Sequence, residues 1–118
     1  MSLEPHVTLA FVKTHNDIDQ RSLALARAIV ARIDADPQRK GLTMAQTTCT
    51  RWLTMNPGPA VSEWHALLTQ DWPTIRNILL DDGEEGRRLR QSSPFCGVLS
   101  VRERWAIYRH FGHEPQAA

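Results

Sequence analysis

The chain has 118 residues, a formal net charge of +1 and 42% hydrophobic residues, which is typical of one globular domain with its own core. No apolar run approaches the roughly 18 residues that a membrane-spanning helix needs, so a membrane span is not expected. Two cysteines are too few for a disulfide scaffold.

The first part of the chain carries few structural signals. Residues 1–5 lack the basic stretch that begins a signal peptide, so we expect a cytoplasmic protein with reduced cysteines. Residues 1–16 are expected to form an irregular N-terminal arm of a single helical domain that covers residues 1–118. Within this arm, residues 6–13 fit either a short strand or a helical turn.

Helical periodicity begins clearly after this arm. Asp17, with Gln20 three residues later, has the spacing of a helix start. This helix is expected to end near residues 34–36, because Pro37 disfavours helical geometry in the residue that precedes it. A second helix is predicted from about Thr43 to the breaker at residues 56–59. The apolar stripes of these two helices are the first part of the predicted core: Leu23, Ala26, Ile29, Val30, Ile33, Leu42, Ala45, Cys49, Trp52 and Leu53.

Three further helices are predicted before residue 92. The third covers residues 61–70. Asp71 caps the fourth, with Pro73 in the first turn, where a missing N–H is tolerated. The fifth is short, over residues 84–91, with acids at its start and arginines at its end, as the helix dipole favours.

The last helix is predicted to begin at Ser100, with Glu103 completing a capping box. Its apolar side is expected to join the core through Val101, Trp105, Tyr108 and Phe111. The loop over residues 92–99 comes before it and is expected to pack into the core through its apolar residues. No alternating strand pattern follows residue 13. The sequence therefore predicts an all-α fold, a compact bundle of five or six short helices.

Charge is distributed unevenly along the chain. Residues 42–86 contain two arginines and six acids, whereas residues 87–113 contain six arginines, no lysine and one acid. The arginines of the second segment are Arg87, Arg88, Arg90, Arg102, Arg104 and Arg109. They either pair with the acids at residues 81–85 or form a contact surface for an acidic protein or for phosphates. Trp72, in a cap region, is the tryptophan expected to be exposed and to join that surface.

No catalytic or metal-binding signature emerges from the remaining motifs. His110 and His113 lie three residues apart, but no Cys-x-x-Cys or His-Glu-x-x-His accompanies them, so no metal site is expected. Ser92, Ser93 and Cys96 share one loop, yet no Gly-x-Ser-x-Gly elbow or evident histidine base supports a nucleophile. We expect no cofactor and no enzymatic activity.

One string of residues resembles a known group of proteins. Residues 88–95 read Arg-Leu-Arg-Gln-Ser-Ser-Pro-Phe, followed by Gly97, Leu99 and the run Glu-Arg-Trp at residues 103–105. With flanking positions over residues 22–111, this pattern resembles small helical bacterial proteins of unassigned function. The resemblance implies an antitoxin-type or accessory partner of nucleotidyltransferase-like enzymes, and it supplies no catalytic residue.

These observations together predict a small cytoplasmic interaction protein without catalytic activity. Its contact residues are expected to be the six C-terminal arginines and Trp72, facing another protein. The alternative is a nucleic-acid-binding transcriptional regulator that places the same arginines on phosphates. A helix-turn-helix at residues 43–70 is disfavoured, since its turn holds two prolines and residues 61–70 hold no arginine or lysine. The oligomeric state stays open.

Overall fold

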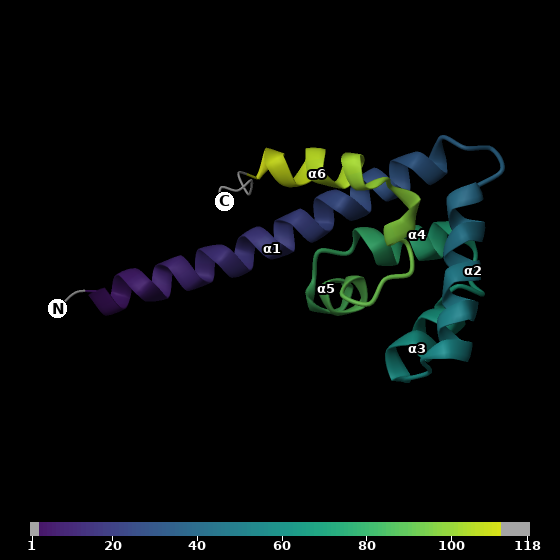
Figure 1. The fold of residues 1–118 in the computed structure, drawn as a ribbon, viewed down its shortest axis with the longest axis horizontal. Coiled ribbons are helices and arrows are strands. Elements are labelled where there is room, and N and C mark those ends of the chain that lie inside the picture. Colours follow the sequence, from purple (N-terminus) through teal and green to yellow (C-terminus); the bar gives the residue numbers. More distant parts are fainter. Residues whose placement is uncertain (1–2, 112–118) are drawn as a thin grey trace.

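The computed structural model describes residues 3–111, with side chains from residue 17 onward, and this part of the chain is built from helices (Figure 1). The elements in chain order are α1 (Leu3–Asp34), α2 (Lys40–Met55), α3 (Pro59–Leu67), α4 (Trp72–Leu80), α5 (Glu84–Arg90), the 3-10 turn η1 (Cys96–Val98) and α6 (Val101–His110). The predicted all-α bundle is confirmed. None of the described helices combines the length and the apolar character needed to cross a membrane.

Helix α1 is the longest of the described helices. At 32 residues, it is not one of the short helices that the sequence predicts. It contacts α2, α4, α5, η1 and α6, which gather around its C-terminal half (Figure 1). The predicted irregular arm is wrong over residues 3–16, because α1 already begins at Leu3. Asp17 lies inside this helix and does not cap it. Two polar residues three positions apart also occur on the surface of a continuous helix, so their spacing alone does not mark a helix start.

The core forms where α1 meets the shorter helices. The predicted stripe of α1 is buried from Leu23 to Ile33, and the centre of α2 adds Ala45 and Cys49. Trp52 and Leu53 are only half-buried, since they lie toward the end of α2. The other buried side chains are Trp64, Leu68, Trp72, Ile75, Leu79, Leu89, Pro94, Phe95, Val98 and Leu99. This core therefore includes the loop after α5, as the sequence predicts.

Two predicted helix caps are present. The Asp71 carboxylate accepts the backbone N–H of Thr74 at 3.2 Å, and Ser100 and Glu103 form a reciprocal capping box at the start of α6. Helix α2 begins at Lys40, three residues before the predicted start at Thr43. The reason lies in the preceding turn, where the Asp36 carboxylate accepts the backbone N–H of Lys40 at 2.8 Å.

Trp64 fixes the loop that joins α5 to η1. Its indole Nε1–H donates to the Leu89 carbonyl oxygen at 2.9 Å, so the polar atom of this buried ring is satisfied. Its ring also meets Phe95 edge-on, with 5.9 Å between ring centroids. The aromatic pair thus holds Phe95 of the loop against the core, and the buried hydrogen bond ties the end of α5 to α3.

Asp34 joins the end of α1 to α4. It accepts hydrogen bonds from Trp72 Nε1 at 2.8 Å and from Arg76 Nε at 2.9 Å. The hydrogen bond from Trp72, and then that from Arg76, lower the pKa of this carboxyl below its ordinary value. Because the pKa is lower in the folded state than in the unfolded state, the ionised carboxylate stabilises the fold at neutral pH.

We expect this contribution to be lost as the pH falls through the folded pKa of Asp34. In the Asp34→Asn variant, the free energy of unfolding should therefore fall less steeply than in the wild type between about pH 5 and pH 3. Urea denaturation at a series of pH values measures both slopes. Parallel slopes would contradict a lowered pKa at Asp34.

Candidate functional site

Arg87 and Arg88, two arginines of the predicted contact surface, are engaged in ion pairs within the chain. Arg88 donates through both terminal nitrogens to the Glu63 carboxylate at 2.9 and 2.8 Å, and it also pairs with Glu85. The same hydrogen bonds from Arg88 lower the pKa of Glu63. Arg87 lies 3.5 Å from an Asp19 carboxylate oxygen. Both arginines are half-exposed, so these pairs add little stability, but they do occupy the guanidinium groups.

Arg90 connects three helices. Its Nε donates to the Ser22 hydroxyl on α1 at 2.9 Å, and its Nη1 donates to the Leu79 carbonyl oxygen at 3.1 Å and to the Asp81 carbonyl oxygen. Burial lowers the pKa of this guanidinium from its ordinary value, against the opposing effect of Asp81 and Asp19. Arg90 thus ties α5 to α1 and to the end of α4.

Arg104 holds the loop before α6. Its Nη1 donates to the Cys96 carbonyl oxygen at 2.8 Å and to the Leu99 carbonyl oxygen at 2.7 Å. The guanidinium therefore faces inward from α6, toward η1, and not toward the outer surface of this helix.

Arg102 and Arg109 are the remaining arginines of the predicted surface. Both are exposed, and within the described part of the chain neither forms an ion pair or side-chain hydrogen bond. Of the six arginines, these two on α6 are the ones whose guanidinium groups have no hydrogen-bond or ion-pair partner among the described residues.

The predicted exposure of Trp72 is wrong. Its side chain is 4% exposed, because the first turn of α4 faces α1 and the indole N–H meets Asp34 there. The predicted burial of Trp105 is also wrong, since its side chain is 49% exposed. The sequence assigns Trp105 to the core, but Ile107 is the α6 residue that packs against the core.

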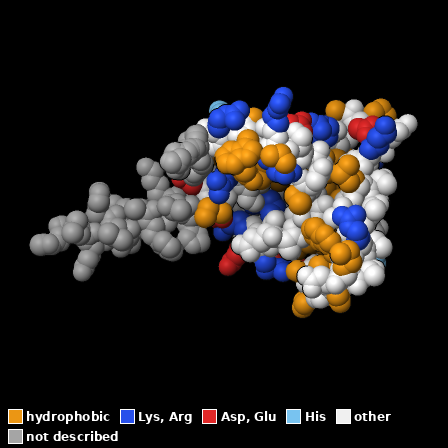
Figure 2. Space-filling model, in the orientation of Figure 1, with side chains coloured by type: hydrophobic (Ala, Val, Ile, Leu, Met, Phe, Trp, Pro, Cys, Tyr) orange, Lys and Arg blue, Asp and Glu red, His pale blue; other side chains and the backbone are white. Residues whose placement is uncertain are grey.

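The outward apolar side of α6 is the most distinctive exposed surface of the described chain. Val101 is 60% exposed, and the Trp105 ring meets the half-buried Tyr108 ring edge-on at 5.6 Å between centroids. The Arg21 guanidinium lies over the other ring of this pair, 4.9 Å from the Tyr108 centroid. We name this surface the α6 face and define it by Val101, Arg102, Trp105, Tyr108 and Arg109. Figure 2 shows hydrophobic side chains beside arginine or lysine side chains along the upper edge of the molecule, where α6 lies.

The apolar spacing that identifies the α6 face is visible in the sequence. Positions 101, 105 and 108 follow the helical repeat, and such a stripe ordinarily packs inward. The inward side of α6 is marked instead by Arg104 and Ile107. An amphipathic pattern would assign the side of α6 that carries Arg104 to solvent. In the structure this side faces inward, because the Arg104 guanidinium donates to two backbone carbonyl oxygens there.

The residues considered as nucleophiles do come together. Ser92, Ser93 and Cys96 line a cavity of about 310 Å³ next to α1, and no histidine among the described residues lines it. Cys96 is exposed and Cys49 is buried. His113 lies outside the described residues, and within them no group of three metal-ligating side chains occurs.

Comparison with known proteins found no match. No protein-family model, curated protein or solved structure matches the chain. The resemblance drawn from residues 88–95 therefore stays a prediction.

Proposed function

We propose that the chain is a small non-catalytic interaction protein that binds another protein through the α6 face. One observation carries this proposal: the apolar side of α6 faces outward, with Trp105 half-exposed at its centre. Contiguous apolar surface on a helix indicates a binding surface, and tryptophan and arginine are the residue types most enriched among energetically important contacts.

The surroundings of Trp105 define the chemistry of the partner. Arg102 and Arg109 flank the exposed ring, and a partner that accepts both would combine an apolar pocket with acidic side chains at its rim. An antitoxin-type or accessory subunit of a bacterial enzyme is the concrete form of this proposal. The resemblance of residues 88–95 supports that form.

A nucleic-acid-binding regulator is the second candidate, and the two available arginines favour it. Four of the six arginines counted toward phosphate binding are already engaged within the chain. Two phosphate contacts give a weak and strongly salt-dependent affinity. We therefore prefer a protein partner, which also uses the exposed tryptophan.

The test is capture from the native lysate with and without nuclease, followed by measurement of the dissociation constant for the captured protein. We expect one stoichiometric, nuclease-resistant partner. Trp105→Ala should weaken its binding by at least about 30-fold, as for a central interface tryptophan. Arg88→Ala is the matched control, because Arg88 is exposed but lies away from α6, and its affinity should be unchanged.

Two results would contradict this proposal. One is a partner lost on nuclease treatment, which supports the regulator and should be followed by a gel shift that weakens between about 50 and 200 mM salt. The other is equal binding by the wild type and Trp105→Ala, which would place the contact elsewhere on the molecule.

A further inference from the structure

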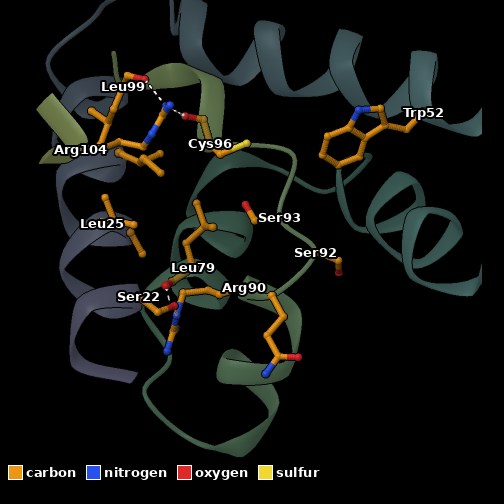
Figure 3. A pocket seen from close by; sticks show the side chains of 13 residues that line it. Ser22, Leu25, Trp52, Leu79, Arg90, Ser92, Ser93, Cys96, Leu99 and Arg104 are labelled. Carbon is orange, nitrogen blue, oxygen red and sulfur yellow. Dashed lines mark hydrogen bonds between the residues drawn. The ribbon is translucent and has the colours of Figure 1, made fainter. Parts of the chain in front are cut away.

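A cavity of about 310 Å³ opens between α1, the end of α4, the loop after α5 and the start of α6 (Figure 3). Its volume lies at the lower end of the range of roughly 300–1,000 Å³ that is typical of small-molecule sites. Its apolar wall consists of Leu25, Ala26, Ile29, Leu79 and Leu99, with Trp52 on the far side of the loop. The cavity is separate from the α6 face, which lies on the outer side of that helix.

The charge of the lining is one-sided. Among the described residues, the cavity is lined by two arginines, Arg90 and Arg104, and by no aspartate or glutamate. Figure 3 shows them toward opposite ends, with Leu25 and Leu79 between them. Asp19 and Asp81 offset the charge of Arg90.

Neither Arg90 nor Arg104 forms an ion pair with an acidic side chain among the described residues. The two differ in the donors that they use, since Arg90 donates through both Nε and Nη1. Within the described part of the chain, Arg104 forms two hydrogen bonds, which both use Nη1 and both end on backbone carbonyl oxygens. They fix the guanidinium at the cavity wall while Nε and Nη2 keep their donor capacity. A guanidinium held in this way is prepared to donate two parallel hydrogen bonds to a carboxylate.

We propose that this cavity binds a small amphipathic carboxylate, with its apolar chain along Leu25, Ile29 and Leu79 and its carboxylate on Arg104. Ser92 and Ser93 of the loop after α5 also line the cavity and add hydroxyl groups to its lining. A cation is disfavoured because the charged side chains that line the cavity in the described part of the chain, Arg90 and Arg104, are both positive. An uncharged apolar ligand would cover the apolar wall but would leave the Arg104 donors without an acceptor.

The experiment titrates the wild-type chain with three probes of equal length: octanoate, octan-1-ol and octylammonium. Amide chemical shifts in ¹H–¹⁵N spectra give both the affinity and the place of binding. We expect octanoate to shift the amides of residues 91–99 and to bind about tenfold or more tightly than octan-1-ol, with octylammonium weakest. Octanoate should also slow the alkylation of Cys96, which lines the cavity, whereas Cys49 is buried and serves as the internal control.

Variants of α6 then test the role of Arg104. Arg104→Gln should lower the affinity for octanoate about tenfold and leave that for octan-1-ol unchanged, so retained binding of the alcohol shows that the cavity is intact. Arg104→Lys should keep part of the preference for the anion. Arg102→Gln is the matched control on the same helix, and its affinities should equal those of the wild type.

Three results on the wild-type chain would overturn the proposal. They are equal affinity for octanoate and octan-1-ol, shifts confined to the α6 face, and no shift at millimolar octanoate. All three results are measured on the wild-type chain. The proposal can therefore still be tested if the Arg104→Gln variant fails to fold.

Discussion

Trp64→Ala is expected to lower the free energy of unfolding by about 3–5 kcal/mol, a large part of the roughly 5–15 kcal/mol available to a domain. The indole ring is 1% exposed, and it is among the largest fully buried side chains of the described chain. Its removal leaves a cavity next to Phe95 and deprives the Leu89 carbonyl oxygen of its N–H donor. Urea denaturation followed by far-UV circular dichroism measures the loss as a lower midpoint.

Two further variants separate the causes of this loss. Trp64→Phe restores most of the apolar ring but not the N–H, so it should cost about 1–3 kcal/mol for the unsatisfied carbonyl and the residual space. Trp105→Ala removes the same side chain from a half-exposed position, and we expect a loss below about 1 kcal/mol. Similar losses at positions 64 and 105 would contradict the assignment of Trp64 to the core and of Trp105 to the surface.

Gly86→Ala is expected to destabilise the fold by about 3 kcal/mol, although alanine ordinarily stabilises a helix interior by about 1 kcal/mol relative to glycine. The reason is a close approach of two backbone segments. A Cβ on Gly86 would overlap the carbonyl oxygen of Asp81 and would lie 2.8 Å from its carbonyl carbon. Since both atoms belong to the backbone, α5 must move away from the end of α4 to relieve the overlap. That movement also disturbs the hydrogen bond from Arg90 to the Asp81 carbonyl.

Gly97→Ala is the control for this prediction. The nearest atom to a Cβ at position 97 is the Met44 sulfur at 3.9 Å, which is an ordinary contact distance. This variant should be neutral or stabilised by up to about 1 kcal/mol, because alanine restricts the unfolded chain. A Gly86→Ala variant as stable as the Gly97→Ala variant would show that α5 does not approach α4 so closely.

The helices and most of the core could be predicted because their signals are local. The stripe from Leu23 to Ile33 repeats at helical spacing, and the caps at Asp71 and Ser100 depend on residues three positions away. The start of α1 was missed because the spacing of Asp17 and Gln20 is the same in a helix interior as at a helix start.

The contact surface could be predicted only in part, because the partners of its side chains are distant in sequence. Arg88 meets Glu63 across 25 positions, Arg90 meets Ser22 across 68, and Trp72 meets Asp34 across 38. A charge count along the chain contains no information about such pairs. The orientation of α6 could not be predicted for the same reason. The sequence shows an apolar stripe, but which side of the helix packs against the core depends on residues that are distant in sequence.

The arrangement of helices around α1 has a consequence for the order of folding. A ribosome completes α1 long before it makes the segments that cover it, since Arg32 pairs with Glu103 and also donates to the Val98 carbonyl oxygen, 66 positions away. Contacts between residues so far apart in sequence form late, because closing the intervening loop lowers the entropy of the chain before any apolar surface is buried. During synthesis the apolar stripe of α1 is thus made before the segments that cover it. The apolar stripe from Leu23 to Ile33 is therefore not fully covered until η1 and α6 have been made.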